Sequence, residues 1–172
     1  MEKGTVYVFV EGDDDQRFVE AVLCVLLRQK YTSVKIWQYS EKPKTKIKDF
    51  LRTILQMEAD VIFIADMDNA PCFTKKKEDL VTRYPELNPT TIFVVKPEIE
   101  GWYVSGVAAD KLNQFGIDIG GGVDSFTKER LDSSLNTDMV RTEVLIELLR
   151  EFSINQAKAR SSSFAYLIDR RC

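Results

Sequence analysis

The sequence predicts an α/β fold: a mostly parallel, four-stranded sheet flanked by helices, with a C-terminal helical extension. Short apolar runs rich in β-branched residues, typical of buried parallel strands, alternate with longer segments whose apolar residues recur at helical spacing. The predicted strands are residues 6–10, 34–39, 61–65 and 91–95. This alternation of strand and helix implies a parallel sheet with right-handed crossovers.

Helices are expected between and after these strands. They are residues 14–29, a segment with Ile47, Leu51 and Ile54 that follows a Lys-rich loop at 40–48, residues 73–84, a segment that Pro97 opens, and residues 137–152 and 157–171. The glycine-rich stretch 114–124 is predicted to be a mobile loop, because it lacks the Lys and Ser/Thr of a phosphate-binding loop. No linker is evident, so one domain is expected over 1–172, with a core at about 1–110 and the loop and C-terminal helices at 111–172.

The composition excludes several kinds of site. The sequence has no histidine, so Ser-His-Asp and Cys-His catalysis are excluded and metal chemistry would rest on carboxylates. Cys24, Cys72 and Cys172 are scattered, which argues against a zinc site or disulfide framework and favours the cytoplasm. No apolar run is long enough to span a bilayer, so no membrane association is expected. The net charge of −3 gives no global attraction to nucleic acid.

Acidic residues follow the first and third predicted strands. Glu11 comes directly after the first strand, and Asp66 and Asp68 come directly after the third. The carboxyl ends of parallel strands form the crevice where open α/β sheets bind ligands. Alternate residues share a face if the strand continues through them, so Asp66 and Asp68 are expected to point the same way. Clustered carboxylates are suitable ligands for Mg²⁺ or Mn²⁺, and we expect a metal site here.

These motifs resemble those of Toprim domains. Glu11, Gly12, Asp15 and Phe18 resemble the first Toprim motif, and the pair Asp66 and Asp68 resembles the second. The resemblance covers roughly the first two-thirds of the chain and is closest to stand-alone Toprim-like proteins and OLD-type nucleases of phage defence. It implies a Rossmann-like, Toprim-like sheet. It also implies that Asp15 assists metal binding, as the second acidic residue does in OLD-type nucleases.

Two later segments extend the resemblance. Glu100, in Pro97–Trp102, resembles the Glu-x-Trp of small Toprim-like defence proteins, which implies that it completes a second metal site or orients a metal ligand. The alternative is a carboxylate at a helix start with Trp102 in the core. Lys158 precedes a Phe-Ala pair, as in OLD-type domains, which implies that it stabilises charge on a transferring phosphate. Arg160 could serve instead, and a solvated basic turn is the remaining alternative.

The resulting hypothesis is a nuclease that depends on Mg²⁺ or Mn²⁺. Glu11, Asp66 and Asp68 would hold one or two metal ions, and Lys158 would assist. The partner would be nucleic acid, DNA or RNA, and an ATPase or other defence-system protein and a homodimer are open alternatives. Lys75–Lys77 and the lysines of 42–48 match either contacts to a nucleic-acid backbone or a solvated face.

Two other classes of function remain open. One is a Mg²⁺-dependent phosphatase or nucleotide-binding protein, because an Asp-x-Asp motif also occurs in haloacid-dehalogenase-type phosphatases. There it follows the first strand, whereas here it follows the third predicted strand. The other is a non-catalytic Toprim-like binding module with a vestigial acidic cluster.

Overall fold

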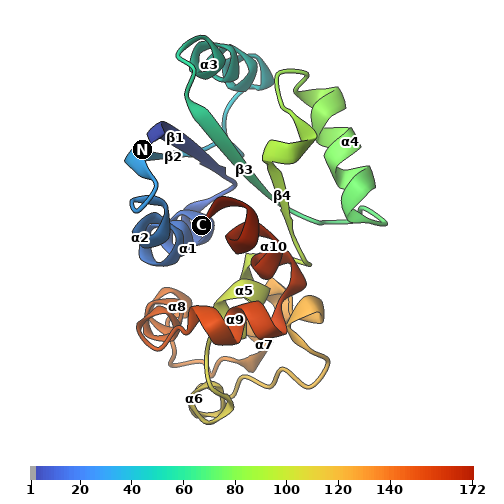
Figure 1. Cartoon of the computed structure of the whole chain (residues 1–172). Coiled ribbons are helices and arrows are strands. Elements are labelled where there is room, and N and C mark those ends of the chain that lie inside the picture. The colour runs from blue at the N-terminus through green and yellow to red at the C-terminus, as the bar shows by residue number, and fades with distance from the viewer. Residues whose placement is uncertain (1–2) are drawn as a thin grey trace. The chain divides into compact units, whose positions relative to one another are not determined.

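The computed structural model describes residues 3–172 and confirms the α/β fold with a parallel sheet. The strands are β1 (Lys3–Val10), β2 (Tyr31–Gln38), β3 (Asp60–Asp66) and β4 (Ile92–Val95). They are arranged in the order β2-β1-β3-β4 (Figure 1). β1 pairs in parallel with both β2 and β3. The two strands that precede the acidic motifs are therefore neighbours.

The chain divides into two compact units. The N-terminal unit extends to Val94 and includes Cys172, and the C-terminal unit is Val95–Arg171. The single domain expected over 1–172 stays a prediction. No helix among residues 3–172 has the length and apolar character needed to cross a membrane.

Helices of the N-terminal unit connect its strands. A continuous helical segment comprises α1 (Asp13–Phe18), a π-helical turn (Val19–Leu23) and α2 (Cys24–Leu27). The other two helices are α3 (Lys44–Gln56) and α4 (Phe73–Arg83). α3 begins inside the stretch 40–48 that was predicted to be a loop. Pro43 stands at its N-cap, and the lysines that follow are good helix formers.

Alternation along the strands builds the core of the N-terminal unit. Tyr7, Phe9 and Phe63 face one side of the sheet, where they pack with Leu51 of α3 and Leu80 of α4. The alternate residues of β1 and β3 are equally buried and face the other side: Val6, Val8, Val10, Ile62 and Ile64. Figure 1 shows α3 and α4 on one face of the sheet and α1–α2 on the other.

The C-terminal unit is helical. Its helices are α5 (Ile99–Ser105), α6 (Ala109–Gln114), α7 (Lys128–Ser134), α8 (Arg141–Arg150), α9 (Ile154–Arg160) and α10 (Ser162–Arg171). Pro97 does not open a helix, because Glu98 is extended and forms the N-cap of α5. The helix predicted over 137–152 is confined to α8, since Val140 is extended and 55% exposed. α6 and α7 are short helices that the sequence pattern did not predict.

The serine run 161–163 has a structural role in the C-terminal unit. Trp102 is fully buried, and its Nε1–H donates to Ser163 Oγ at 2.8 Å. The Lys96 backbone N–H donates to the same hydroxyl at 3.3 Å. Ser161 Oγ accepts from the backbone N–H of Phe164 at the start of α10. The serines therefore fasten α10 to α5 and to the residue after β4.

We expect Ser163→Ala to destabilise the protein by about 1–3 kcal/mol, because it removes the acceptor of a buried indole N–H. Ser162→Ala is the matched control, since Ser162 is exposed and its hydroxyl makes only a 3.3 Å contact with Asp124. Urea unfolding of both variants would measure the difference. Equal midpoints for the two variants would contradict a structural role of the Ser163 hydroxyl.

Candidate metal centre at the ends of β1 and β3

Glu11 follows β1 directly and is anchored through one oxygen. Its Oε1 accepts from the Tyr39 hydroxyl at 3.0 Å and from the backbone N–H of Asp66 at 3.2 Å. Its Oε2 accepts no hydrogen bond from residues 3–172. The carboxylate is thus held across the ends of three adjacent strands, and one oxygen remains available to a ligand.

Tyr39 is the residue that positions Glu11. It follows β2, is 7% exposed, and its ring stacks on that of Phe63 with 4.5 Å between centroids. Its hydroxyl lies between two acceptors, Glu11 Oε1 and the carbonyl of Ile64 at 3.1 Å. A phenol has a single proton to donate, and an ionised carboxylate is a stronger acceptor than a backbone carbonyl. Glu11 is therefore the preferred acceptor for Tyr39.

The charge around Tyr39 is negative. Burial raises the pKa of Tyr39 well above its usual value, and the nearby carboxylates of Glu11, Asp15 and Asp66 raise it further. Tyr39 therefore remains protonated and acts as a donor. Of these three carboxylates, that of Glu11 accepts a hydrogen bond from the Tyr39 hydroxyl.

Asp15 is buried at the start of α1. It is 6% exposed, and its Oδ2 accepts from the backbone N–H of Gly12 at 3.3 Å. This contact satisfies one of the free N–H groups at the helix N-terminus. One Asp15 oxygen is therefore used by the helix start, and its metal role stays a prediction.

Asp66 and Asp68 have different surroundings. Asp66 is the last residue of β3, next to Glu11. Asp68 lies beyond the strand with φ 49°, a left-handed conformation that Asp tolerates better than most residues. Its Oδ2 pairs with the Lys76 ammonium of α4 at 2.5 Å. The extended geometry expected through both residues was wrong, because the strand ends at Asp66 and the chain turns.

Among the side chains that the structure describes, no three Asp, Glu or Cys residues form a ready-made ligand cluster. Mg²⁺ does not require one, since it usually keeps several waters and binds one or two carboxylates together with substrate phosphates. Glu11 Oε2 and the neighbouring Asp66 carboxylate are oxygen donors of the kind such an ion prefers. This donor set fits a hard divalent cation with an incomplete protein shell.

Glu100 is paired within the C-terminal unit. It is 3% exposed and forms an ion pair with Arg141, which also pairs with Asp132 at 2.6 Å. Burial raises the pKa of Glu100, and the Arg141 guanidinium opposes that rise. Arg141 lies 41 residues from Glu100 in the chain, and no local pattern in the sequence predicts this pair. The predicted metal role of Glu100 stays a prediction.

We expect Arg141→Gln to destabilise the protein by about 3–5 kcal/mol near neutral pH, because it leaves a buried carboxylate without its cation. A raised carboxyl pKa means that the folded state holds the proton more tightly than the unfolded chain. The resulting stabilisation is present below the unfolded value of about 4.3 and is lost as pH rises through the raised pKa. Without Arg141 that pKa rises further, so the loss of stability should be larger at neutral pH than in acid.

Unfolding of Arg141→Gln across this pH range would measure the effect. Asp132→Asn is the control, since Asp132 is half-exposed and its loss should change stability little. The double variant with Glu100→Gln should recover most of the stability. A pH-independent loss would contradict a charged Glu100.

Lys158 and Arg160 both have partners in the C-terminal unit. Lys158 Nζ pairs with Asp169 at 2.6 Å. Arg160 Nη1 donates to the carbonyl of Val107 at 2.8 Å. The phosphate-stabilising role that the resemblance implies for Lys158 stays a prediction.

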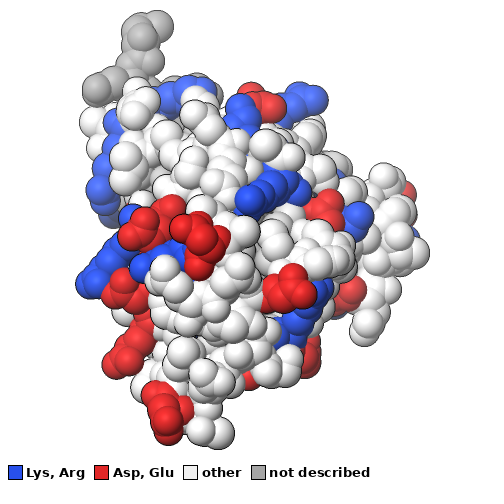
Figure 2. Space-filling model, turned by 90° about the horizontal axis from the view of Figure 1, so that it is seen from below, with Lys and Arg blue, Asp and Glu red and all other residues white. Residues whose placement is uncertain are grey.

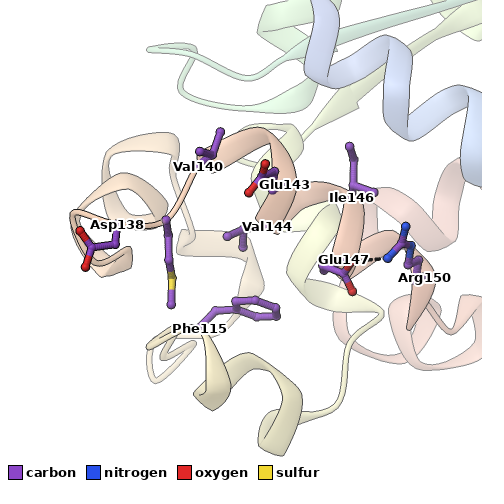
Figure 3. A pocket seen from close by; sticks show the side chains of 9 residues that line it. Phe115, Asp138, Val140, Glu143, Val144, Ile146, Glu147 and Arg150 are labelled. Carbon is purple, nitrogen blue, oxygen red and sulfur yellow. Dashed lines mark hydrogen bonds and ion pairs between the residues drawn. The ribbon is translucent and has the colours of Figure 1, made fainter.

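The C-terminal unit also contains a pocket of about 440 Å³ between α6 and α8 (Figure 3). Phe115, Val140 and Ile146 contribute apolar surface to its lining. Its charged side chains are Asp138, Glu143, Glu147 and Arg150, and Arg150 already pairs with Glu147. An excess of acidic groups makes this pocket unsuitable for a phosphate.

The charged surface is mixed. On the face seen in Figure 2, acidic side chains lie beside basic ones, with uncharged surface between them. A face of this kind produces no strong field of one sign. Binding of a polyanion there would depend on individual cations that contact phosphates.

No family profile and no curated protein matches the sequence. Two solved structures superpose on the chain. The C-terminal region of the Xanthomonas campestris pv. campestris OLD protein has 15% identity and a TM-score of 0.45, with 99% of this chain and 94% of that chain covered. The C-terminal region of the Burkholderia pseudomallei OLD protein has 15% identity and a TM-score of 0.42, with 99% and 95% covered. Similarity at this level assigns no family, residue role or activity to this chain.

Proposed function

We propose that the protein is a metal-dependent nuclease and that its metal centre lies at the ends of β1 and β3. One observation carries this proposal. Glu11 is fixed by Tyr39 and by the backbone N–H of Asp66 through one oxygen, and its other oxygen accepts no hydrogen bond from residues 3–172. A carboxylate anchored in this way is preorganised to hold a cation at the sheet edge.

The chain's own residues would divide the work. Glu11 and Asp66 would hold Mg²⁺ or Mn²⁺, and Asp68 would join them after leaving Lys76. A cation bound there would supply charge neutralisation at the scissile phosphate and would make a water molecule more acidic. Tyr39 would keep Glu11 in place by donating its proton. Asp15, Glu100 and Lys158 are further candidates on the strength of the sequence resemblance.

A non-catalytic binding module is the second candidate function. The observation that favours it is the Asp68–Lys76 ion pair, which satisfies one motif carboxylate without a metal. Such a module would bind nucleic acid or a partner protein without cutting it.

Incubation of the protein with single-stranded DNA, double-stranded DNA and RNA, with Mn²⁺ or Mg²⁺ and with a chelator, tests the proposal. We expect cleavage of at least one substrate that stops when the chelator is added. Calorimetric titration with Mn²⁺ in the absence of nucleic acid separates the two candidates. Metal binding without cleavage would favour the binding module, and no metal binding would overturn the metal centre itself.

A further inference from the structure

A pocket of about 400 Å³ lies beside Asp68 within the N-terminal unit. Its basic lining residues are Lys75, Lys76 and Arg83, all from α4, and its acidic ones are Asp68 and Asp79. The pocket is therefore next to one of the proposed metal ligands and has one more cation than anion. A hollow with this charge is suited to an anion such as a phosphate.

Helix α4 fixes the basic side of this pocket. Lys76, Leu80 and Arg83 are spaced by four and three residues and lie on one helix face. Leu80 is 5% exposed and packs in the core beneath the sheet face, which sets the rotation of α4. The positions of Lys76 and Arg83 are thus determined by core packing.

The cations of the pocket differ in how they are paired. Lys75 pairs with Asp79 at 2.9 Å, and Lys76 pairs with Asp68 at 2.5 Å. Arg83 makes no ion pair or side-chain hydrogen bond with residues 3–172. The Lys76 side chain is 13% exposed and that of Asp68 is 58% exposed, so the ammonium lies close to the protein and the carboxylate at its rim.

The Asp68 carboxylate is thus paired with Lys76, and a bound divalent cation would compete with Lys76 for it. In the absence of metal the carboxylate is neutralised by Lys76. A divalent ion held by Glu11 and Asp66 would draw Asp68 away, and the Lys76 ammonium would then be shielded from solvent without its counter-ion. An anion entering the pocket would restore the balance, with Arg83 as the second contact.

We propose that Lys76 binds a backbone phosphate of the nucleic acid once a divalent cation has bound the Asp68 carboxylate. Before that, the ion pair with Asp68 keeps Lys76 from contacting the phosphate. This inference rests on the proposed function and adds to it a phosphate subsite and a coupling between metal and substrate. Because coupling is reciprocal, metal and nucleic acid should each strengthen binding of the other, by about 5- to 100-fold.

The test compares the wild type with Lys76→Gln, and with Lys77→Gln as the matched control. Lys77 is the next residue of α4 and does not line the pocket. The probes are Mn²⁺ alone, followed by short fluorescent DNA and RNA strands with phosphorothioate linkages that resist cleavage. Circular dichroism would check that both variants keep the helix.

We expect Lys76→Gln to bind Mn²⁺ more tightly than the wild type in the absence of nucleic acid, because the competing cation is gone. With Mn²⁺ present, it should bind the strands more weakly, and the slope of log K against log salt should fall by about 0.7, the value for one phosphate contact on a single strand. Without Mn²⁺ the wild type and Lys76→Gln should differ much less in strand binding, because Lys76 is then paired with Asp68 and contacts no phosphate. Lys77→Gln should follow the wild type throughout.

Three outcomes would overturn the inference. If Mn²⁺ binds the wild type and Lys76→Gln with the same affinity, Asp68 and Lys76 are not exchanged, although the metal centre stands. If Lys77→Gln weakens strand binding as much as Lys76→Gln, the loss reflects the change in net charge and not a phosphate contact of Lys76, and the inference fails. If the wild type binds no Mn²⁺, the proposed function and this inference both fail.

Discussion

Asp66→Asn should lower metal-dependent cleavage by at least about 100-fold, because it removes one of the two carboxylates that would hold the metal at the sheet edge. The change keeps the size of the side chain and leaves the backbone N–H that donates to Glu11. The fold and the position of Glu11 should therefore survive. Cleavage of labelled nucleic acid under single-turnover conditions, with thermal unfolding alongside, would measure both properties.

Asp13→Asn is the matched control for this experiment. Asp13 is an exposed carboxylate of the first acidic motif, and its contact is a hydrogen bond from the Gln38 side chain at 2.8 Å. Its neutralisation removes the same charge close to the site, so it should leave cleavage nearly unchanged. Equal activity of Asp66→Asn and wild type would assign any cleavage to another site or to a contaminant.

The sheet could be predicted from the sequence because its signals are local. Each buried strand is a short apolar run, and the connections between them are long enough to require crossovers. The acidic motifs could be placed for the same reason, since Glu11 and Asp66 sit at positions where strands end. Helix ends were less predictable: Val140 is apolar and in phase with α8, yet it is extended and exposed.

The partners of the motif residues could not be predicted, because they depend on contacts between distant segments. Tyr39 reaches Glu11 only through the register of β1 and β2, which pairs Val10 with Gln38. If that register had been known, the hydroxyl of the residue directly after β2 could have been predicted to reach Glu11. The sequence alone also does not show that Asp68 turns toward Lys76, since that turn depends on a left-handed residue beyond the strand.

Tyr39→Phe should weaken Mn²⁺ binding by about 10- to 100-fold, the range seen when a residue that orients a metal ligand is lost. The Glu11 carboxylate would keep the hydrogen bond from the backbone N–H of Asp66 but lose the charge-assisted one from the phenol. With a single hydrogen bond the carboxylate can rotate, so Oε2 would no longer be held in one place. The ring itself would still stack on Phe63, and the destabilisation should stay within about 1–3 kcal/mol.

Tyr7→Phe provides the matched control for that change. Tyr7 belongs to the same core cluster, packs edge-on against Phe50, and makes no side-chain hydrogen bond with the described residues. It should therefore bind Mn²⁺ like the wild type. Calorimetric titration gives the two affinities without reference to cleavage, and urea unfolding gives the two stabilities. If Tyr39→Phe loses stability but keeps the affinity of Tyr7→Phe for Mn²⁺, the phenol is part of the core alone and does not position Glu11.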